Sequence, residues 1–208
     1  MGAQPNWWEH ESDFEVIIGA ILTQQTTWRS VKIAIANLKS NNILNIDSMR
    51  KAGNQEIEES IRPSGFYRQK RSTIRNMISL IDNQYGSSLL TMHKQPKEAL
   101  RTAILSVKGI GEESADSILL YGFNKPSFVV DAYTRRITSR ALGVNTTISY
   151  QKMQEFMINP IPKNLLLYKK IHANIVELAK KHCIKKDPLC GNCPVREMCV
   201  YKKNFYLH

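Results

Sequence analysis

Four cysteines near the end of the chain have the residue type and the spacing of a metal-binding set. They follow the pattern Cys-x6-Cys-x2-Cys-x5-Cys at Cys183, Cys190, Cys193 and Cys199, so four thiolates can converge on one centre. Structural zinc sites usually use two CxxC knuckles separated by a longer loop, and only the middle pair has that spacing here. The wider gaps favour a cube-shaped [4Fe–4S] cluster over zinc, and a disulfide pair is the least favoured alternative.

A second candidate site is the glycine pair in the segment Leu105–Ala115, LSVKGIGEESA. Gly109 and Gly111 allow a tight turn with positive φ, which would end one helix and open the next. The exposed amide groups of such a turn, with the positive end of the following helix, suit a DNA phosphate. Ile110 would anchor the turn in the core, and Lys108 precedes it as a further backbone contact. An ordinary helix–helix turn would show a similar pattern.

An acidic residue, Asp131, follows the apolar run Phe128–Val130 and would open the next helix. An acid at this position is by default an N-cap, whose side chain accepts a hydrogen bond from the first helical turn. Asp131 comes after the helix that leaves the glycine turn, so it could approach DNA held there. The pattern is compatible with a structural role and with a catalytic one.

The elements that must position these groups show helical periodicity along nearly the whole chain. Apolar side chains recur on one helical face in segments that begin at Phe14, Trp28, Ile74 and Leu167. Sustained period-two alternation is absent, and the run Pro126–Asp131 is too short to carry a sheet. The connections are short and marked by turn residues. The sequence therefore predicts an all-α fold.

The chain is basic, with 29 Lys and Arg against 18 Asp and Glu, a net charge of +11, and a pI of about 9.6. The segment from Lys163 to Lys203 holds ten basic residues and three acidic ones, a net charge of +7. Such an excess favours a polyanionic partner because each neutralised phosphate releases condensed counterions. A solvated basic face is the alternative.

The sequence shows no secretory signal and no membrane helix. The first apolar run, Phe14–Leu22, contains Glu15 and lacks a preceding basic region. It is also far shorter than the roughly 20 residues that a membrane helix needs. We expect an intracellular, cytoplasmic protein, associated with the nucleoid in a prokaryote, in which four cysteines are better suited to ligation than to disulfides.

Together, the glycine turn, the VDA segment at Asp131 and the cysteine set resemble the endonuclease III superfamily of base-excision glycosylases. The resemblance spans residues 14–199 and implies a helical barrel at 14–130 with a helix-hairpin-helix motif at 100–121. Residues 1–13 and 131–208 would form a second helical domain with the cluster loop at 183–199. The resemblance also implies a [4Fe–4S] cluster on the four cysteines, Asp131 as the catalytic aspartate, and a monomer that binds double-stranded DNA containing a damaged base.

Further segments resemble parts of this family that enter DNA. ILTQQTTW places Gln25 where a glutamine fills the space left by an extruded nucleotide, and SGFYRQK places Phe66, with Tyr67 beside it, where an apolar side chain enters the duplex. A helix-terminal polar residue and a core aromatic are the ordinary alternatives. The full set expected in the base pocket and at the DNA insertion is Trp7, Trp8, Gln25, Trp28, Phe66, Tyr67 and Tyr133.

One departure from the family pattern concerns the mechanism. Family members that also cut the strand carry a lysine two residues after the second hairpin glycine, and here Glu113 occupies that position. A carboxylate cannot form the Schiff base that strand cleavage requires. The sequence therefore predicts monofunctional hydrolysis, with Glu113 adding negative potential near Asp131 or making only a surface ion pair.

The substrate is predicted from a narrower resemblance, to the branch that acts on alkylated purines such as 3-methyladenine. The segment NWW, with Trp7 and Trp8, supports it because an alkylated purine is cationic and is attracted to indole faces. Glu9 follows the tryptophans where the branch has proline, and the pair could instead anchor the N-terminus on the barrel. A glycosylase for mismatched thymine or uracil or for oxidised pyrimidines, including one with AP-lyase activity, is an alternative. A non-catalytic iron–sulfur DNA-binding protein is another.

Overall fold

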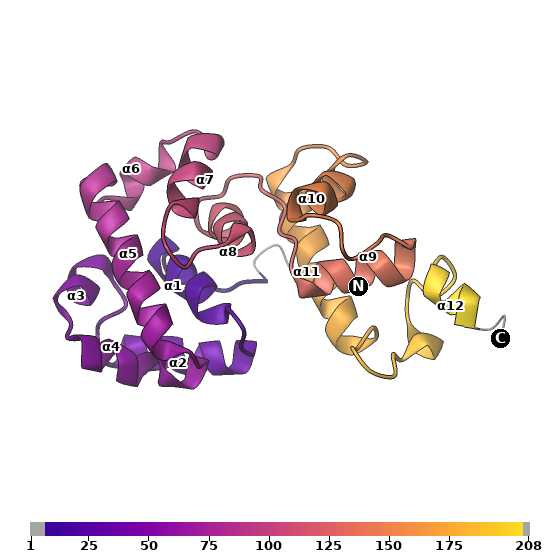
Figure 1. Cartoon of the computed structure of the whole chain (residues 1–208), viewed down its shortest axis with the longest axis horizontal. Coiled ribbons are helices and arrows are strands. Elements are labelled where there is room, and N and C mark those ends of the chain that lie inside the picture. The colour runs from indigo at the N-terminus through magenta and orange to yellow at the C-terminus, as the bar shows by residue number, and fades with distance from the viewer. Residues whose placement is uncertain (1–6, 206–208) are drawn as a thin grey trace. The chain divides into compact units, whose positions relative to one another are not determined.

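A computed structural model of the chain describes residues 7–205, with side chains through Lys202, and all regular structure among these residues is helical (Figure 1). The predicted all-α class is confirmed. The described residues divide into two compact units, residues 8–125 and residues 126–205 together with Trp7. These boundaries lie a few residues before those expected from the sequence. Each unit has its own apolar core.

The unit of residues 8–125 is built around one buried helix, α1 (Asp13–Thr23), in which every side chain from Phe14 to Leu22 is buried. A helix with apolar side chains on nearly all faces is typical of the interior of a domain. The apolar periodicity in the sequence had indicated only one buried face. The Ser12 hydroxyl caps it by accepting from the Glu15 amide. The remaining elements of this unit are α2 (Trp28–Ser40), α3 (Ile46–Lys51), α4 (Asn54–Ile61), η1 (Arg62–Ser64), α5 (Tyr67–Tyr85), α6 (Leu89–His93), α7 (Lys97–Leu105), α8 (Glu112–Ser117) and the π-turn η2 (Ile118–Gly122).

A bidentate ion pair joins the two helices that flank the glycine turn. Arg101 of α7 donates through Nε and Nη2 to the two carboxylate oxygens of Asp116 in α8, at 2.8 and 3.0 Å. The Asp116 side chain is fully buried, so its charge depends on this partner. The pair therefore fixes how α7 and α8 meet beneath the turn.

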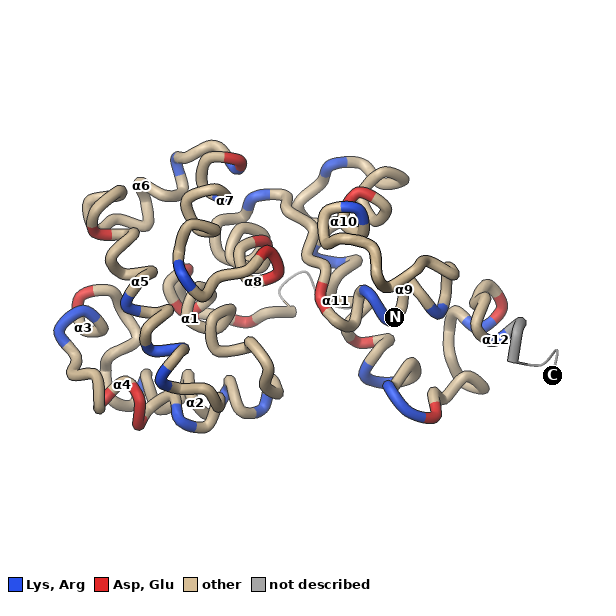
Figure 2. The backbone as a smooth tube through the Cα atoms, viewed as in Figure 1, with Lys and Arg blue, Asp and Glu red and all other residues tan. Residues whose placement is uncertain are grey.

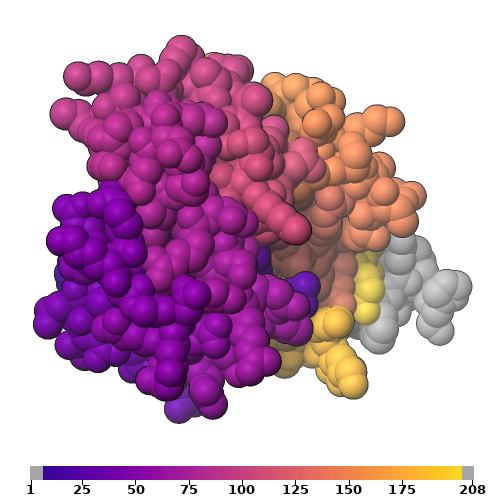
Figure 3. Space-filling view, turned by 60° about the vertical axis from the view of Figure 1, so that its left-hand side comes forward, coloured from indigo at the N-terminus to yellow at the C-terminus, as the bar shows by residue number. Residues whose placement is uncertain are grey.

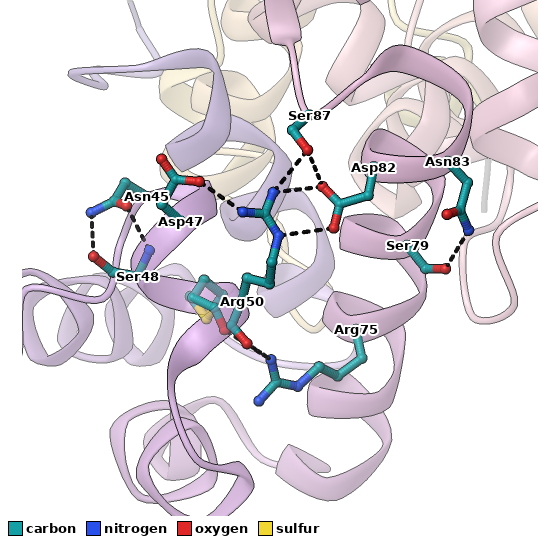
Figure 4. Close-up of polar contacts among 10 residues, drawn as sticks. Asn45, Asp47, Ser48, Arg50, Arg75, Ser79, Asp82, Asn83 and Ser87 are labelled. Carbon is teal, nitrogen blue, oxygen red and sulfur yellow. Dashed lines mark hydrogen bonds and ion pairs between the residues drawn. The ribbon is translucent and has the colours of Figure 1, made fainter.

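Two arginines fasten α3 to α5 in the same unit (Figure 4). Arg50 of α3 donates to both carboxylate oxygens of Asp82 in α5, at 2.9 and 2.6 Å, and this guanidinium holds the pKa of Asp82 below its usual value against the opposing effect of burial. Arg75 of α5 donates to the backbone carbonyls of Met49, Arg50 and Ala52. A cation on α5 thus satisfies the unpaired carbonyls at the end of α3.

The second unit packs α9 (Ala132–Leu142) against α11 (Leu165–Lys181) and α12 (Val200–Phe205). Its other elements are α10 (Tyr150–Ile158) and the single turn η3 (Cys190–Asn192). Arg136 and Arg140 on α9 donate to backbone carbonyls of the loop that follows α11, at Cys183, Ile184 and Lys185. These bonds attach the start of the cysteine segment to α9.

Among the described residues, no helix combines the length and the apolar composition that crossing a membrane requires. This finding agrees with the expectation from the sequence.

We predict that Arg101→Met lowers the free energy of unfolding by about 3 kcal/mol, because it removes the bidentate ion pair of the buried Asp116 carboxylate. Chemical denaturation monitored by circular dichroism measures this. Lys97→Met is the matched control on the same helix, since Lys97 pairs with the exposed Glu98 and should change stability by less than about 1 kcal/mol. Equal effects of the two variants would contradict the buried brace.

Candidate active site and DNA-contacting elements

Asp131 lies at the N-cap of α9, in the unit of residues 126–205. Its Oδ1 accepts from the Thr134 amide at 2.6 Å, and its Oδ2 lies 3.5 Å from Nε2 of His172. The carboxylate is 14% exposed. Burial acts to raise its pKa, but His172 and the Thr134 amide outweigh burial and hold the pKa of Asp131 below its ordinary value. Asp131 is therefore a largely buried carboxylate that is ionised at neutral pH.

His172 was not predicted from the sequence, although it contacts the predicted catalytic residue. It projects from α11, is 5% exposed, and meets the edge of the Trp7 ring with the ring centroids 6.0 Å apart. Trp7 is held in turn by a hydrogen bond from Nε1 to Glu177 at 3.2 Å. One signal in the sequence could have identified it. His172 follows Ile171 directly on the apolar face of the predicted helix, where a polar side chain becomes buried.

The glycine turn lies between α7 and α8, as predicted. Only one of its two glycines has a backbone conformation and surroundings that require glycine. Gly109 has φ +100°, and a Cβ there would lie 2.1 Å from the Thr73 hydroxyl oxygen. Gly111 has φ −102° and ψ 178° as the N-cap of α8, and a Cβ there would meet nothing within 4 Å. The expectation of positive φ at both glycines was therefore wrong for Gly111, because its extended backbone is open to any residue.

The amides of the turn are not all available to a ligand. Ile110 is buried, as expected, but its amide donates to the carbonyl of Val107 at 3.0 Å, so it cannot also bind a phosphate. Lys108 is exposed, and its carbonyl accepts from Asn76. The segment of residues 100–125, coloured rose, forms part of the surface of its unit (Figure 3).

Gln24 fastens the loop between α1 and α2 to this turn, a contact that sequence reasoning missed. Its side-chain amide donates to the Gly109 carbonyl at 2.9 Å and to the Ser114 hydroxyl at 3.1 Å. The neighbouring Gln25 is exposed and has a left-handed backbone with φ +51°. Of the two adjacent glutamines, one thus binds the protein and the other points into solvent.

Phe66 also combines a left-handed backbone with exposure, and it is the one apolar residue among the described non-glycine residues with positive φ. It has φ +47° at the start of α5, follows Gly65, and is 57% exposed although apolar. Tyr67 differs, because its ring is half-buried and lies beneath the guanidinium groups of Arg62 and Arg68 at 5.2 and 5.6 Å. Strain in such residues persists only where the surrounding structure holds them.

The two tryptophans of the NWW segment belong to different units. Trp8 is 9% exposed and packs in the core of residues 8–125, against Trp28 and Tyr121 at centroid distances of 5.2 and 5.3 Å. A Cβ on Gly19 would lie 2.9 Å from the Trp8 ring. Trp8 therefore anchors the chain on α1, which is the alternative that the sequence left open.

Tyr133 and Trp7, in the other unit, both face a cation of the protein. The Lys180 ammonium lies 5.4 Å from the Trp7 ring centroid and 6.0 Å from that of Tyr133, and Arg136 lies over Tyr133 at 5.2 Å. Glu113 is exposed in the first turn of α8, where the helix dipole favours a carboxylate. Glu113 and Asp131 lie in different units.

The four cysteines are free thiols that line one small cavity between α9, α11 and the loop. Burial raises the pKa of Cys190, and electrostatic interaction with the other three cysteines raises it further. Among the described residues, no group of three or more Cys, His, Asp or Glu side chains is gathered closely enough to hold a single metal ion.

The sequence matches a family of known proteins: residues 18–163 fit the model of the HhH-GPD superfamily of base excision DNA repair proteins. The chain belongs to this superfamily. It is 44% identical over 199 residues to a Methanocaldococcus jannaschii protein, MJ1434, whose activity as a DNA repair glycosylase is itself inferred; the match covers 95% of this chain and 90% of that protein.

Solved structures show the same fold. A non-covalent endonuclease III–DNA complex has a TM-score of 0.82 at 22% identity, over 96% of this chain and 88% of that one. The 3-methyladenine DNA glycosylase MagIII of H. pylori, bound to 1,N6-ethenoadenine, has a TM-score of 0.74 at 30% identity, over 86% and 89%. The predicted endonuclease III-like fold is confirmed, and the family assignment makes this chain a DNA glycosylase.

We predict that His172→Leu raises the pKa of Asp131, because burial then acts with less opposition. Carboxyl ¹³C NMR titration measures this, with Asp131→Asn assigning the signal. Because the native pKa is depressed, the interaction stabilises the fold above the unfolded pKa and is lost as pH falls through the native one. Tyr168→Phe, buried on the same helix, is the control. An unmoved signal in His172→Leu would contradict the pairing.

Proposed function

We propose that this glycosylase hydrolyses the N-glycosidic bond of an alkylated purine in double-stranded DNA without cutting the strand. The observation that carries the proposal is the largely buried, ionised carboxylate of Asp131, which Thr134 and His172 hold in place. The damaged nucleotide must leave the base stack, because its sugar bond is inaccessible within the duplex. Gln25 and Phe66, exposed on left-handed backbone, are the side chains suited to enter the vacated space.

The Asp131 carboxylate accounts for the chemistry of hydrolysis. Cleavage of the bond between C1′ and the base nitrogen develops positive charge on the sugar, which a fixed carboxylate stabilises. The same group orients the attacking water and accepts its proton as the new C1′–O bond forms. Its ionised state at neutral pH suits both tasks, and the Thr134 amide restricts its rotation.

The absence of strand cleavage is proposed from Glu113. The carboxylate of Glu113 stands where a lysine amine would attack the sugar, so a Schiff base cannot form there. Lys108, the nearest lysine in the sequence, is exposed before the turn, and its backbone is fixed by the bond from Asn76.

An alkylated purine is proposed as the substrate because the aromatic surfaces near Asp131 attract cations. The rings of Trp7 and Tyr133 already attract the Lys180 ammonium, and a positively charged purine would be attracted to them in the same way. Lys180 is exposed, so it can leave for solvent. The likeness to a 3-methyladenine DNA glycosylase, at 30% identity over 86% of this chain, supports the same substrate class.

We also propose that Cys183, Cys190, Cys193 and Cys199 hold a [4Fe–4S] cluster. All four line one cavity, and their spacing suits a cube-shaped cluster better than a single ion. When bound, the cluster would fix the loop structurally, and the exposed Lys185 and Lys186 of that loop would be available for DNA phosphates. Figure 2 shows Lys and Arg distributed along the backbone of both units. The purified protein should be brown, with visible absorption that a d¹⁰ zinc site lacks, and Cys193→Ser should lose it. A colourless protein with bound zinc would refute the cluster.

A panel of duplexes with single lesions tests the activity and the substrate. Release is expected from 3-methyladenine and other alkylated purines. Asp131→Asn should slow release by about 10²–10⁴-fold with DNA affinity largely unchanged. Release only of mismatched thymine or uracil or of oxidised pyrimidines would overturn the substrate proposal. Binding without release of any base would mean a non-catalytic DNA-binding protein.

Borohydride trapping tests the monofunctional mechanism. The wild type should give no covalent adduct with lesion DNA, since position 113 holds a carboxylate. Glu113→Lys should gain trapping, because an amine then stands at the attacking position. Glu112→Lys, one residue away in the same turn, is the matched control and should gain none. Efficient trapping by the wild type would mean that another amine attacks the sugar.

A further inference from the structure

Lys70 is a buried cation on α5 that the proposed chemistry does not use. It is 3% exposed, and its ammonium donates to the backbone carbonyls of Leu22 at 2.9 Å and Ser64 at 2.6 Å. Leu22 lies in the last turn of α1, and Ser64 ends η1. One side chain thus bonds to the ends of two elements that are separated by about forty residues in the sequence.

Each of these carbonyls lies just before an exposed residue with a left-handed backbone. Gln25 follows Leu22 by three residues, and Phe66 follows Ser64 by two. Their φ angles are +51° and +47°, a region that costs a non-glycine residue of order 1–3 kcal/mol. Lys70 therefore holds the start of both strained segments at one point.

Lys70 also lies on the helix that supports the glycine turn. Thr73, one turn further along α5, would collide with any Cβ on Gly109, and Gln24 ties the loop before α2 to the Gly109 carbonyl. The same side of α5 thus contacts the segments around Gln25, Phe66 and Gly109. These three are the DNA-contacting segments of this unit under the proposed function.

Keeping an ammonium at this position is unfavourable in itself. Burial lowers the pKa of Lys70 to about 8, so the charged form is destabilised, and the two carbonyl bonds offset only part of that cost. An apolar side chain would avoid the desolvation but would leave both carbonyls without this donor. The charge is thus tied to positioning two backbone segments rather than to filling space.

We propose that Lys70 is a positioning residue that couples the Gln25 loop (residues 24–27) to the Phe66 loop (residues 64–66), so that both side chains enter the duplex as one unit. The inference rests on the proposed function in assuming that these two side chains contact DNA. It adds that their contributions depend on each other through a buried side chain that touches no DNA.

A double-mutant cycle tests this coupling with the full chain and a duplex containing a tetrahydrofuran abasic-site analogue, which is bound without being cleaved. Affinity is measured for Gln25→Ala, Phe66→Ala and the pair, in the wild type and in Lys70→Met. In the wild type the double variant should depart from additivity by at least about threefold, and in Lys70→Met the departure should vanish. Each single change should also cost less in Lys70→Met.

Arg75→Met is the matched control. Arg75 is also a cation of α5 that donates to carbonyls at a helix end (Figure 4), but its acceptors, Met49, Arg50 and Ala52, cap α3 and belong to neither loop. Its loss should lower the melting temperature without changing the cycle. Should Lys70→Met be unfolded at the assay temperature, Lys70→Gln, which keeps a donor with a shorter reach, takes its place.

The outcomes separate this inference from the proposed function. Additive effects of Gln25→Ala and Phe66→Ala in the wild type, or equal non-additivity with and without Lys70, would overturn the coupling. A cycle disturbed as strongly by Arg75→Met would show a general loss of stability instead and would also overturn it. Failure of the proposed function appears elsewhere, as a wild type that binds the analogue but releases no base.

Discussion

At Asp131, burial and the neighbouring side chains have opposite effects on the pKa of the carboxylate. The candidate site in the unit of residues 126–205 depends on the balance between them. A carboxylate that is only 14% exposed would normally be pushed towards its neutral form. The Thr134 amide and the His172 ring reverse this and keep the pKa low. His172 is held in turn by its contact with Trp7, which Glu177 fixes by a hydrogen bond. The charge that the proposed chemistry needs is thus a property of two packed helices and one loop.

Strained backbone has a comparable place in the unit of residues 8–125. The turn at Gly109, the loop at Gln25 and the loop at Phe66 each contain a residue with positive φ. Side chains of α5 bond to backbone carbonyls beside these segments: Lys70 to those of Leu22 and Ser64, and Asn76 to that of Lys108. Buried helices therefore support exposed segments with positive φ. This arrangement is expected in a protein whose surface has to distort a duplex.

Several Lys and Arg side chains of this protein bond to its own backbone carbonyls, which the amino-acid composition does not indicate. Lys70 and Arg75 satisfy carbonyls in one unit, and Arg136 and Arg140 satisfy carbonyls of the cysteine loop in the other. A net charge of +11 counts these side chains together with those that face solvent. The number of cations available to DNA is therefore smaller than the number in the sequence.

Local periodicity and short-range spacing were sufficient to predict the helical class, the place of the glycine turn, the cysteine set and the position of Asp131 at the start of a helix. They could not predict that Gly111 has an ordinary backbone, that Trp8 is a core residue, that Gln24 binds the turn while Gln25 is exposed, or that His172 and Lys70 are buried beside their partners. Such features arise from contacts between segments far apart in the chain. Burial, which sets pKa values and selects which of two neighbouring side chains points outward, is a property of those contacts and not of the local sequence.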